Sequence, residues 1–156
     1  MGFAIAIIVA FGRGLILQTS WRAYERFALD EGKRQGDDAI VRILIVDDEP
    51  DVRFMMRLIF ESVGYQVTEA RHGVAGLKSV KARQPDLVTT DVMMPMMDGL
   101  EFIERLRSDP ETAAIPILVV SGNSELAVAA NTRLGKPFAA RDLLHAAALL
   151  IGEDRG

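Results

Sequence analysis

The stretch that decides the fold is residues 41–50, which read VRILIVDDEP. Apart from Arg42, its first six residues are apolar and mostly β-branched, which is typical of a strand buried on both faces of a sheet. Asp47 and Asp48 end this strand. Pro50 can begin a helix, because a first helical turn does not use the N–H that proline lacks. The stretch therefore predicts a strand that leads through two acidic residues into a helix.

Strands and helices alternate through the rest of the chain. Further strands are expected at 65–70, 86–90, 115–120 and, as a very short element, 133–135. Helices are expected after Pro50 and Asp98, and at 73–83, 124–130 and 139–151. Such alternation predicts an α/β fold with an open, doubly wound parallel sheet that helices cover on both faces.

Apolar residues at helical spacing indicate which face of two of these helices is buried. The helix after Pro50 is expected to bury Phe54, Leu58, Ile59 and Val63. The helix after Asp98 is expected to bury Leu100, Ile103 and Leu106. Both stripes would face the predicted sheet.

Length and composition narrow the class of protein. The 156 residues suffice for one domain and a modest extension. A net charge of −4 without a long basic run argues against a nucleic-acid partner, and the absence of cysteine excludes disulfides and thiolate metal sites. The polar stretch at 30–38 is typical of a linker. We expect an N-terminal extension at 1–40, a domain at 41–151 and a tail at 152–156.

The N-terminal extension allows two interpretations. Its apolar run at 3–11 is far shorter than the roughly 20 residues that span a membrane. A signal peptide would require a positive residue before the run, and none is present. A short amphipathic helix is expected around Trp21–Ala28. The extension is either upstream sequence joined by a misplaced start, or a segment in which residues 3–17 pack on the domain, on a partner or on a membrane surface.

Five polar residues follow or end the predicted strands at one edge of the sheet. They are Asp47 and Asp48 after the first strand, Asp91 after the third, Ser121 after the fourth and Lys136 after the fifth. In open α/β sheets, ligands bind beyond the carboxyl ends of the strands. Each residue alone is an ordinary turn or loop residue, so the joint placement carries the prediction of a site.

This set of side chains is suited to phosphoryl chemistry. Three carboxylates brought together repel one another unless a cation neutralises them, and Mg²⁺ prefers oxygen ligands. A carboxylate can attack phosphorus to give an aspartyl phosphate, while Mg²⁺, a lysine and a serine hydroxyl stabilise the phosphoryl oxygens. His72 and His145 lack partners at metal-ligand spacing, and we interpret both as structural or exposed.

Four motifs extend this interpretation over residues 41–151. They read ILIVDDEP, DLVTTDVMMPMMDGLEFIERLR, IPILVVSG and LGKPF. With them the chain resembles a response-regulator receiver domain of two-component systems, the family of the chemotaxis response regulator. The resemblance implies a flavodoxin-like sheet of five parallel strands in the order 2-1-3-4-5.

The resemblance also implies roles for the site residues. Asp91 resembles the phosphoacceptor, which shares a Mg²⁺ ion with Asp47, Asp48 and the main-chain carbonyl of Met93. Ser121 resembles the hydroxyl that turns toward the phosphoryl group, and Lys136 the cation that pairs with Asp91 and then with the phosphoryl group. The resemblance further implies a cis peptide bond between Lys136 and Pro137.

The implied function is that of a stand-alone receiver in the cytoplasm. A histidine kinase or a histidine phosphotransfer protein would supply the phosphoryl group, and an unknown downstream protein would read the changed surface. The chain would phosphorylate and dephosphorylate itself and would not be a turnover enzyme. Only residues 152–156 follow the last predicted helix, so no output domain is expected, and membrane contact is expected only if residues 3–17 provide it.

Two features depart from the family pattern. Ser121 and Lys136 are only 15 positions apart, so the fourth helix of the family is expected to be shorter by about two turns. Arg133 stands where the family usually has an aromatic residue that swings inward. An arginine cannot shed its charge and is costly to bury. We hypothesise that signalling uses an order–disorder change in residues 122–132.

Two other functions compete with this interpretation. A pseudo-receiver would bind partners without phosphorylation, but such proteins usually lose a site residue and this chain keeps them all. A phosphatase of the haloacid-dehalogenase type would want a second acid two residues after the nucleophile, where this chain has Met93.

Overall fold

The computed structural model describes residues 9–11, 14–16, 40–127 and 129–153. The chain divides into two compact units, Met1–Gln35 and Gly36–Gly156. In the first unit, strands β1 (Val9–Phe11) and β2 (Gly14–Ile16) form an antiparallel pair, which the sequence analysis did not predict. The helix expected around Trp21–Ala28 lies outside the described residues. None of the helices in the described ranges is long and apolar enough to cross a membrane.

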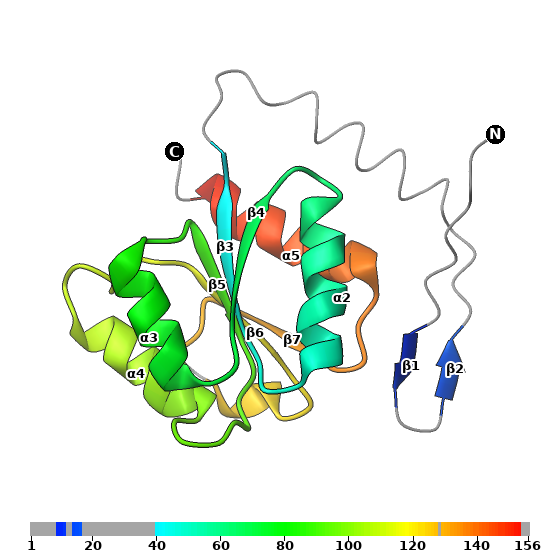
Figure 1. Cartoon of the computed structure of the whole chain (residues 1–156), viewed down its shortest axis with the longest axis horizontal. Helices are drawn as coiled ribbons and strands as arrows, with labels where there is room; N and C mark the ends of the chain where they lie inside the picture. The colour runs from blue at the N-terminus through cyan, green and yellow to red at the C-terminus, as the bar shows by residue number, and fades with distance from the viewer. Residues whose placement is uncertain (1–8, 12–13, 17–39, 128, 154–156) are drawn as a thin grey trace. The chain divides into compact units, whose positions relative to one another are not determined.

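The second unit is a five-stranded parallel sheet with helices between the strands (Figure 1). Its strands are β3 (Arg42–Val46), β4 (Gln66–Ala70), β5 (Leu87–Thr90), β6 (Ile117–Ser121) and β7 (Thr132–Gly135). Its helices are α2 (Pro50–Glu61), α3 (Gly73–Ala82), α4 (Gly99–Ser108) and α5 (Ala140–Glu153), with a 3₁₀ helix, η1, at Ser124–Leu126. The order β4-β3-β5-β6-β7 confirms the expected 2-1-3-4-5 arrangement.

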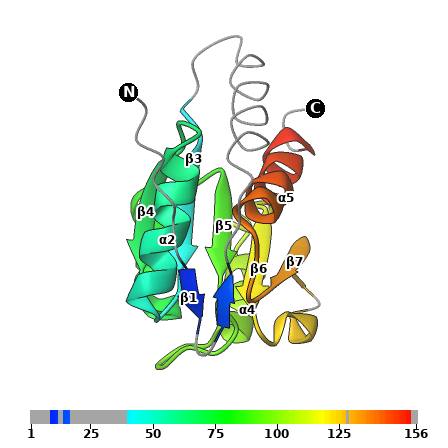
Figure 2. The ribbon, with the colours of Figure 1, turned by 90° about the vertical axis from the view of Figure 1, so that its right-hand side faces the viewer.

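Helices cover both faces of this sheet, as the α/β prediction required. Helices α2 and α5 lie on one face and α3 and α4 on the other (Figures 1 and 2). Strands β6 and, beyond Arg42, β3 are buried on both faces, which explains their continuous apolar sequences. Phe60 of α2 and Phe102 of α4 are fully buried on opposite sides.

Side-chain caps begin two of the helices. The Asp98 carboxylate accepts a hydrogen bond from the Glu101 N–H at 2.8 Å, as expected for the start of α4. His72 caps α3, because its Nδ1 accepts a hydrogen bond from the Ala75 N–H at 3.1 Å. This contact confirms the structural interpretation of His72.

The predicted apolar stripe of α2 was wrong. Phe54 and Leu58 are 52% and 38% exposed, and of the four predicted residues only Ile59 is buried. The buried face consists instead of Val52, Met55, Met56, Ile59 and Phe60. Both faces of α2 carry apolar residues at helical spacing, so periodicity alone could not choose between them. Phe54 lies under the Arg57 guanidinium, 5.4 Å from the ring centre. In α4, likewise, Ile103 and Leu106 are buried but Leu100 is 37% exposed.

The described residues of the connection from β6 to β7 form no α-helix. The helix expected through Ala130 is reduced to the three residues of η1, which confirms that the family's fourth helix is cut short. Ala127 is buried in the core cluster beneath this connection, and Ala130 packs against the same cluster. The small side chains of Ala127 and Ala130 therefore pack against the core here, whereas elsewhere a helix face covers the sheet.

Candidate functional site

Main-chain hydrogen bonds extend the sheet just far enough to place two acidic residues side by side. The Asp47 N–H donates to the carbonyl of Ala70 at 3.1 Å, and the Asp91 N–H donates to the carbonyl of Val46 at 2.9 Å. Both residues follow buried strands, and both are themselves buried. The carboxyl ends of β3 and β5 therefore bring these carboxylates together, as the sequence predicted.

The N-terminus of α4 packs closely against the main chain of Asp91. The Gly99 N–H donates to the carbonyl of Val92 at 2.7 Å. A Cβ atom at Gly99 would lie only 1.9 Å from the Asp91 carbonyl oxygen, so no other residue fits without moving the loop. Gly99 thus positions Asp91, a role that sequence reasoning missed because the contact joins residues that are not neighbours in the chain.

Asp47, Asp48 and Asp91 form a cluster with the donor set of a divalent-cation site. One carboxylate oxygen from each lies within 4.8 Å of the other two. Asp47 and Asp91 are buried, whereas Asp48 is exposed, so the cluster opens to solvent on one side. Three hard oxygen donors with an open side suit Mg²⁺, which keeps several of its waters. The residues present therefore fit this ion.

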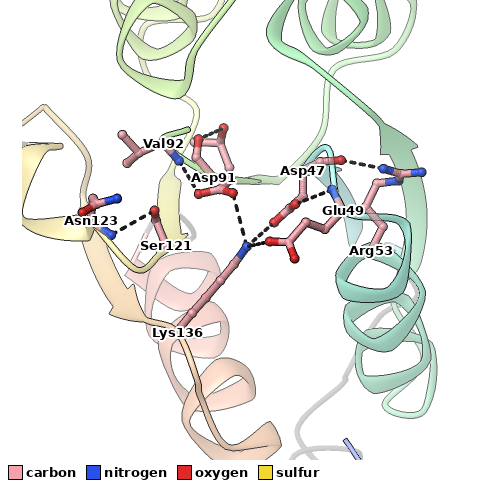
Figure 3. Close-up of polar contacts among 9 residues, drawn as sticks. Asp47, Glu49, Arg53, Asp91, Val92, Ser121, Asn123 and Lys136 are labelled. Carbon is pink, nitrogen blue, oxygen red and sulfur yellow. Dashed lines mark hydrogen bonds and ion pairs between the residues drawn. The ribbon is translucent and has the colours of Figure 1, made fainter. Parts of the chain in front are cut away.

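Lys136, which follows β7, contacts two carboxylates of this cluster, Asp47 and Asp91, and also Glu49 (Figure 3). Its Nζ lies 2.8 Å from Asp47 Oδ2, 3.2 Å from Asp91 Oδ2 and 3.1 Å from Glu49 Oε1. The Lys136 N–H donates to the Ser121 carbonyl at 3.2 Å, which fixes the lysine beside the end of β6. The Lys136–Pro137 peptide bond is cis, as expected.

Burial and neighbouring charges have opposite effects on the pKa values of Asp47 and Lys136. Burial raises the pKa of Asp47 to about 6, although its hydrogen bond to Lys136 works against that rise. Burial also opposes the charge of Lys136, but hydrogen bonds and attraction from Asp47, Asp91 and Glu49 prevail and raise its pKa above the usual value. At neutral pH the ammonium and the Asp47 carboxylate are both ionised, and they form an ion pair.

Hydrogen bonds hold each buried carboxylate in one orientation. Asp91 Oδ1 accepts from the Val92 N–H at 2.7 Å, and Asp47 Oδ1 accepts from the Glu49 N–H at 2.9 Å. The other oxygen of each faces Lys136. Arg53 of α2 donates to the Asp47 main-chain carbonyl at 2.6 Å, which ties the acidic loop to the helix that follows it.

Ser121 ends β6 and is 1% exposed. Its Oγ accepts a hydrogen bond from the Asn123 N–H at 3.2 Å (Figure 3). The hydroxyl therefore stabilises the turn that leads into η1. Any reorientation of this side chain would release the Asn123 N–H. The Ser121 hydroxyl thus connects the site to the β6–β7 connection.

Sequence reasoning found the acids, the serine and the lysine but not their supporting residues. Glu49 directly follows the acidic pair, and this adjacency was the available signal for its contact with Lys136. Arg53 is one of two arginines in α2, and nothing in the sequence distinguished it from Arg57. The Met93 side chain is 63% exposed, and the metal-binding role of its main-chain carbonyl stays a prediction.

Comparison with known proteins agrees with this geometry. The family model described as "Response regulator receiver domain" matches residues 43–148. The Pseudomonas aeruginosa protein PilH is 34% identical over 105 residues, which are 67% of this chain and 84% of PilH. The Synechocystis transcriptional regulator RpaA is 35% identical over 122 residues, which are 73% of this chain and 51% of RpaA. The chain thus spans about half the length of RpaA and most of PilH.

Solved structures show the same fold. A CheY-like receiver domain protein from Methanospirillum hungatei superposes with a TM-score of 0.70 at 27% identity, over 75% of this chain and 98% of that one. The chemotaxis response regulator CheY4 of Vibrio cholerae superposes with a TM-score of 0.67 at 27% identity, over 72% of this chain and 99% of that one.

Proposed function

The chain belongs to the response-regulator receiver family, and from this premise we propose that it accepts a phosphoryl group on Asp91. The donor is the phosphorylated histidine of a histidine kinase or a histidine phosphotransfer protein, the partners of this family. The observation that carries the proposal is the ammonium of Lys136 within 3.2 Å of Asp91 Oδ2, beside two further carboxylates.

Asp91 is built to act as the nucleophile. The Val92 N–H donates to one carboxylate oxygen and so orients the side chain. A carboxylate oxygen of Asp91 forms the new O–P bond while the P–N bond to the donor histidine breaks. The electron pair of that bond stays on the histidine nitrogen.

The carboxylates of Asp47, Asp48 and Asp91 and the main-chain carbonyl of Met93 would hold Mg²⁺. When bound, the ion neutralises oxygen charge that builds up as the phosphoryl group is transferred. Asp48 is exposed and lies nearest to solvent, so it can accept the ion from solution without unfolding of the loop. This donor set contains no nitrogen or sulfur, which favours Mg²⁺ over softer metals.

Lys136 neutralises the transferred group from the opposite side. Its ammonium touches Asp91 before the reaction and is within reach of a phosphoryl oxygen afterwards. The raised pKa of Lys136 keeps it charged at every physiological pH. Main-chain attachment to Ser121 holds it at the end of β6.

The output of the domain begins at Ser121. When its hydroxyl turns toward the phosphoryl group, the Asn123 N–H loses its acceptor and the turn before η1 is freed. The changed surface at 122–131 is then read by a downstream protein. In this proposal residues 41–151 act as a cytoplasmic receiver that undergoes phosphorylation and dephosphorylation without turning over a substrate.

Intact-mass analysis after incubation with acetyl phosphate tests the proposal. The unaltered protein and Asp142→Asn, a control on the exposed face of α5, should each gain one phosphoryl group only when Mg²⁺ is present. Asp91→Asn should gain none. No adduct on the unaltered protein would favour a pseudo-receiver that binds partners without phosphorylation. Repeated turnover of a phosphate ester would favour a phosphatase instead.

A further inference from the structure

Glu49 contacts the catalytic lysine but belongs to neither the cation cluster nor the acceptor. Its Oε1 lies 3.1 Å from Lys136 Nζ, while the carboxylates that cluster for a cation are those of Asp47, Asp48 and Asp91. The three N–H bonds of the ammonium are therefore shared among Asp47, Asp91 and Glu49. Of these three acids, Glu49 is the one whose function the site chemistry has not used.

The position of Glu49 in α2 makes this contact more than a chance surface pair. Glu49 is the N-cap residue of α2, and its carbonyl accepts a hydrogen bond from the Arg53 N–H at 3.1 Å. Its own N–H donates to Asp47. An acidic side chain there is normally attracted to the free N–H groups of the first helical turn. The Glu49 side chain forms no such cap bond and reaches across to Lys136 instead (Figure 3).

Phosphorylation forces a redistribution of these contacts. A phosphoryl group on Asp91 replaces the carboxylate that Lys136 now contacts. It carries more charge than that carboxylate and three acceptor oxygens, so it draws a second N–H of the ammonium away from Asp47 or Glu49. Asp47 is held by its short side chain, its burial and its hydrogen bond to the Glu49 N–H. The side chain of Glu49 is 57% exposed and longer, so it can leave at the smallest cost in desolvation.

We propose that Glu49 is a positioning residue that competes with the phosphoryl group for Lys136 and thereby weakens the hold of the site on phosphodonors. The inference rests on the proposed function of Asp91. In the resting state Glu49 occupies one donor of the ammonium and adds a negative charge at the mouth of the site. Both effects oppose the approach of a phosphoryl dianion, and neither touches the carboxylate that carries out the attack.

The test compares Glu49→Gln with the unaltered protein by the dependence of adduct formation on acetyl phosphate concentration. Glutamine keeps the length of the side chain and removes its charge. The half-saturating concentration should fall about two- to fivefold, the equivalent of a partly exposed ion pair, while the maximal rate stays within about twofold. Half-saturation by beryllium fluoride with Mg²⁺, a phosphoryl mimic followed by thermal shift, should fall by a similar factor.

Two matched variants separate competition from a general effect of charge. Glu101→Gln removes an acid in the first turn of α4 that, like Glu49 at the start of α2, pairs with a cation, here Arg105 at 2.9 Å. It should leave the half-saturating concentrations of acetyl phosphate and of beryllium fluoride unchanged. Glu49→Asp keeps the charge on a shorter side chain and should lie between the unaltered protein and Glu49→Gln.

The outcomes distinguish a failure of the role of Glu49 from a failure of the proposed function of Asp91. An unchanged or higher half-saturating concentration in Glu49→Gln, with normal phosphorylation of the unaltered protein, would overturn the role of Glu49 alone. A fall in the maximal rate would mean that Glu49 holds Lys136 in a productive place, which is the opposite of competition. No adduct on the unaltered protein would overturn the proposed function and this inference with it.

Discussion

The connections that enter and leave strand β6 are built in different ways. The β5–β6 connection contains α4, which begins at a side-chain cap and buries Phe102, Ile103 and Leu106. Where the structure describes it, the β6–β7 connection has no helix but η1, and none of the three residues of η1 is buried. It covers the sheet with Ala127 and depends on polar side chains for its attachment.

Those polar attachments lie at both ends of the second connection. The Asn131 Oδ1 accepts hydrogen bonds from the Ile117 N–H at 2.8 Å and from Arg107 at 2.7 Å. Arg133 donates to the Glu125 carbonyl at 3.1 Å, and the Ser121 hydroxyl accepts from the Asn123 N–H. Arg133 is exposed, and the expectation that it cannot swing inward as an aromatic residue would stays a prediction.

The difference teaches that a connection of a parallel sheet can be held in place without a helix. Hydrogen bonds then stabilise it in place of extensive apolar burial. Apolar burial in α4 is worth several kcal/mol per large side chain, whereas a hydrogen bond contributes about 1 kcal/mol. We therefore expect the β6–β7 connection to open locally at a lower free energy than α4. The stable connection positions Asp91, and the weaker one begins at Ser121, where a phosphorylation signal would leave the site.

The largest difference should appear when one apolar side chain is removed from each connection. Phe102→Ala should lower the free energy of unfolding by about 3–5 kcal/mol, because Phe102 is fully buried and leaves a cavity. Leu126→Ala in η1 should change it by less than about 0.5 kcal/mol, since Leu126 is 52% exposed. Urea unfolding measures both. Equal losses would show that η1 packs as firmly as α4.

A second comparison uses the glycine near the start of each connection. Gly99→Ala should cost about 1–3 kcal/mol and displace Asp91, because the added Cβ meets the Asp91 carbonyl. Adduct formation with acetyl phosphate should fall along with stability. Gly122→Ala should change neither by much, as no atom lies within 4 Å of its added Cβ. Normal phosphorylation of Gly99→Ala would contradict the positioning role of Gly99.

The polar attachment of the second connection can be removed by itself. Asn131→Ala should lower the free energy of unfolding by about 1–2 kcal/mol, since the Ile117 N–H and one Arg107 N–H lose their acceptor. Asn123→Ala is the control, because the Asn123 side chain makes no cap hydrogen bond to η1. If both variants unfold at the same urea concentration as the unaltered protein, the attachment at Asn131 contributes nothing.

The smallest expected effect is on local opening during signalling. Binding of beryllium fluoride with Mg²⁺ should raise amide hydrogen exchange at 122–127 by up to about tenfold, the equivalent of one lost hydrogen bond. Amides of α4 should change by less than about twofold. Hydrogen–deuterium exchange with mass spectrometry resolves the two segments. Unchanged exchange at 122–127 would contradict the order–disorder hypothesis.

Much of the candidate site was predictable because it lies at strand ends. Buried strands are recognisable by their continuous apolar runs, and the residue after each strand is then known from the sequence alone. Asp47 after β3 and Ser121 at the end of β6 were located in this way, whereas Lys136 follows β7, a short strand that is not fully buried. The contact of Arg53 had no signal in the sequence, and that of Glu49 had only its adjacency to the acidic pair. Both contacts depend on which way a flexible side chain turns once the elements are packed.

The shortened segment after Ser121 followed from the resemblance to the receiver family. Local signals in the sequence were sufficient for the α/β class, the parallel sheet and the cap at Asp98. They are carried by residues close together in the chain, so periodicity and turn chemistry reveal them. The buried face of α2, the close fit of Gly99 against Asp91 and the reach of Glu49 to Lys136 depended on packing between distant segments. Those choices are set by which surfaces meet and exclude water, and that information exists only when the whole sheet is assembled.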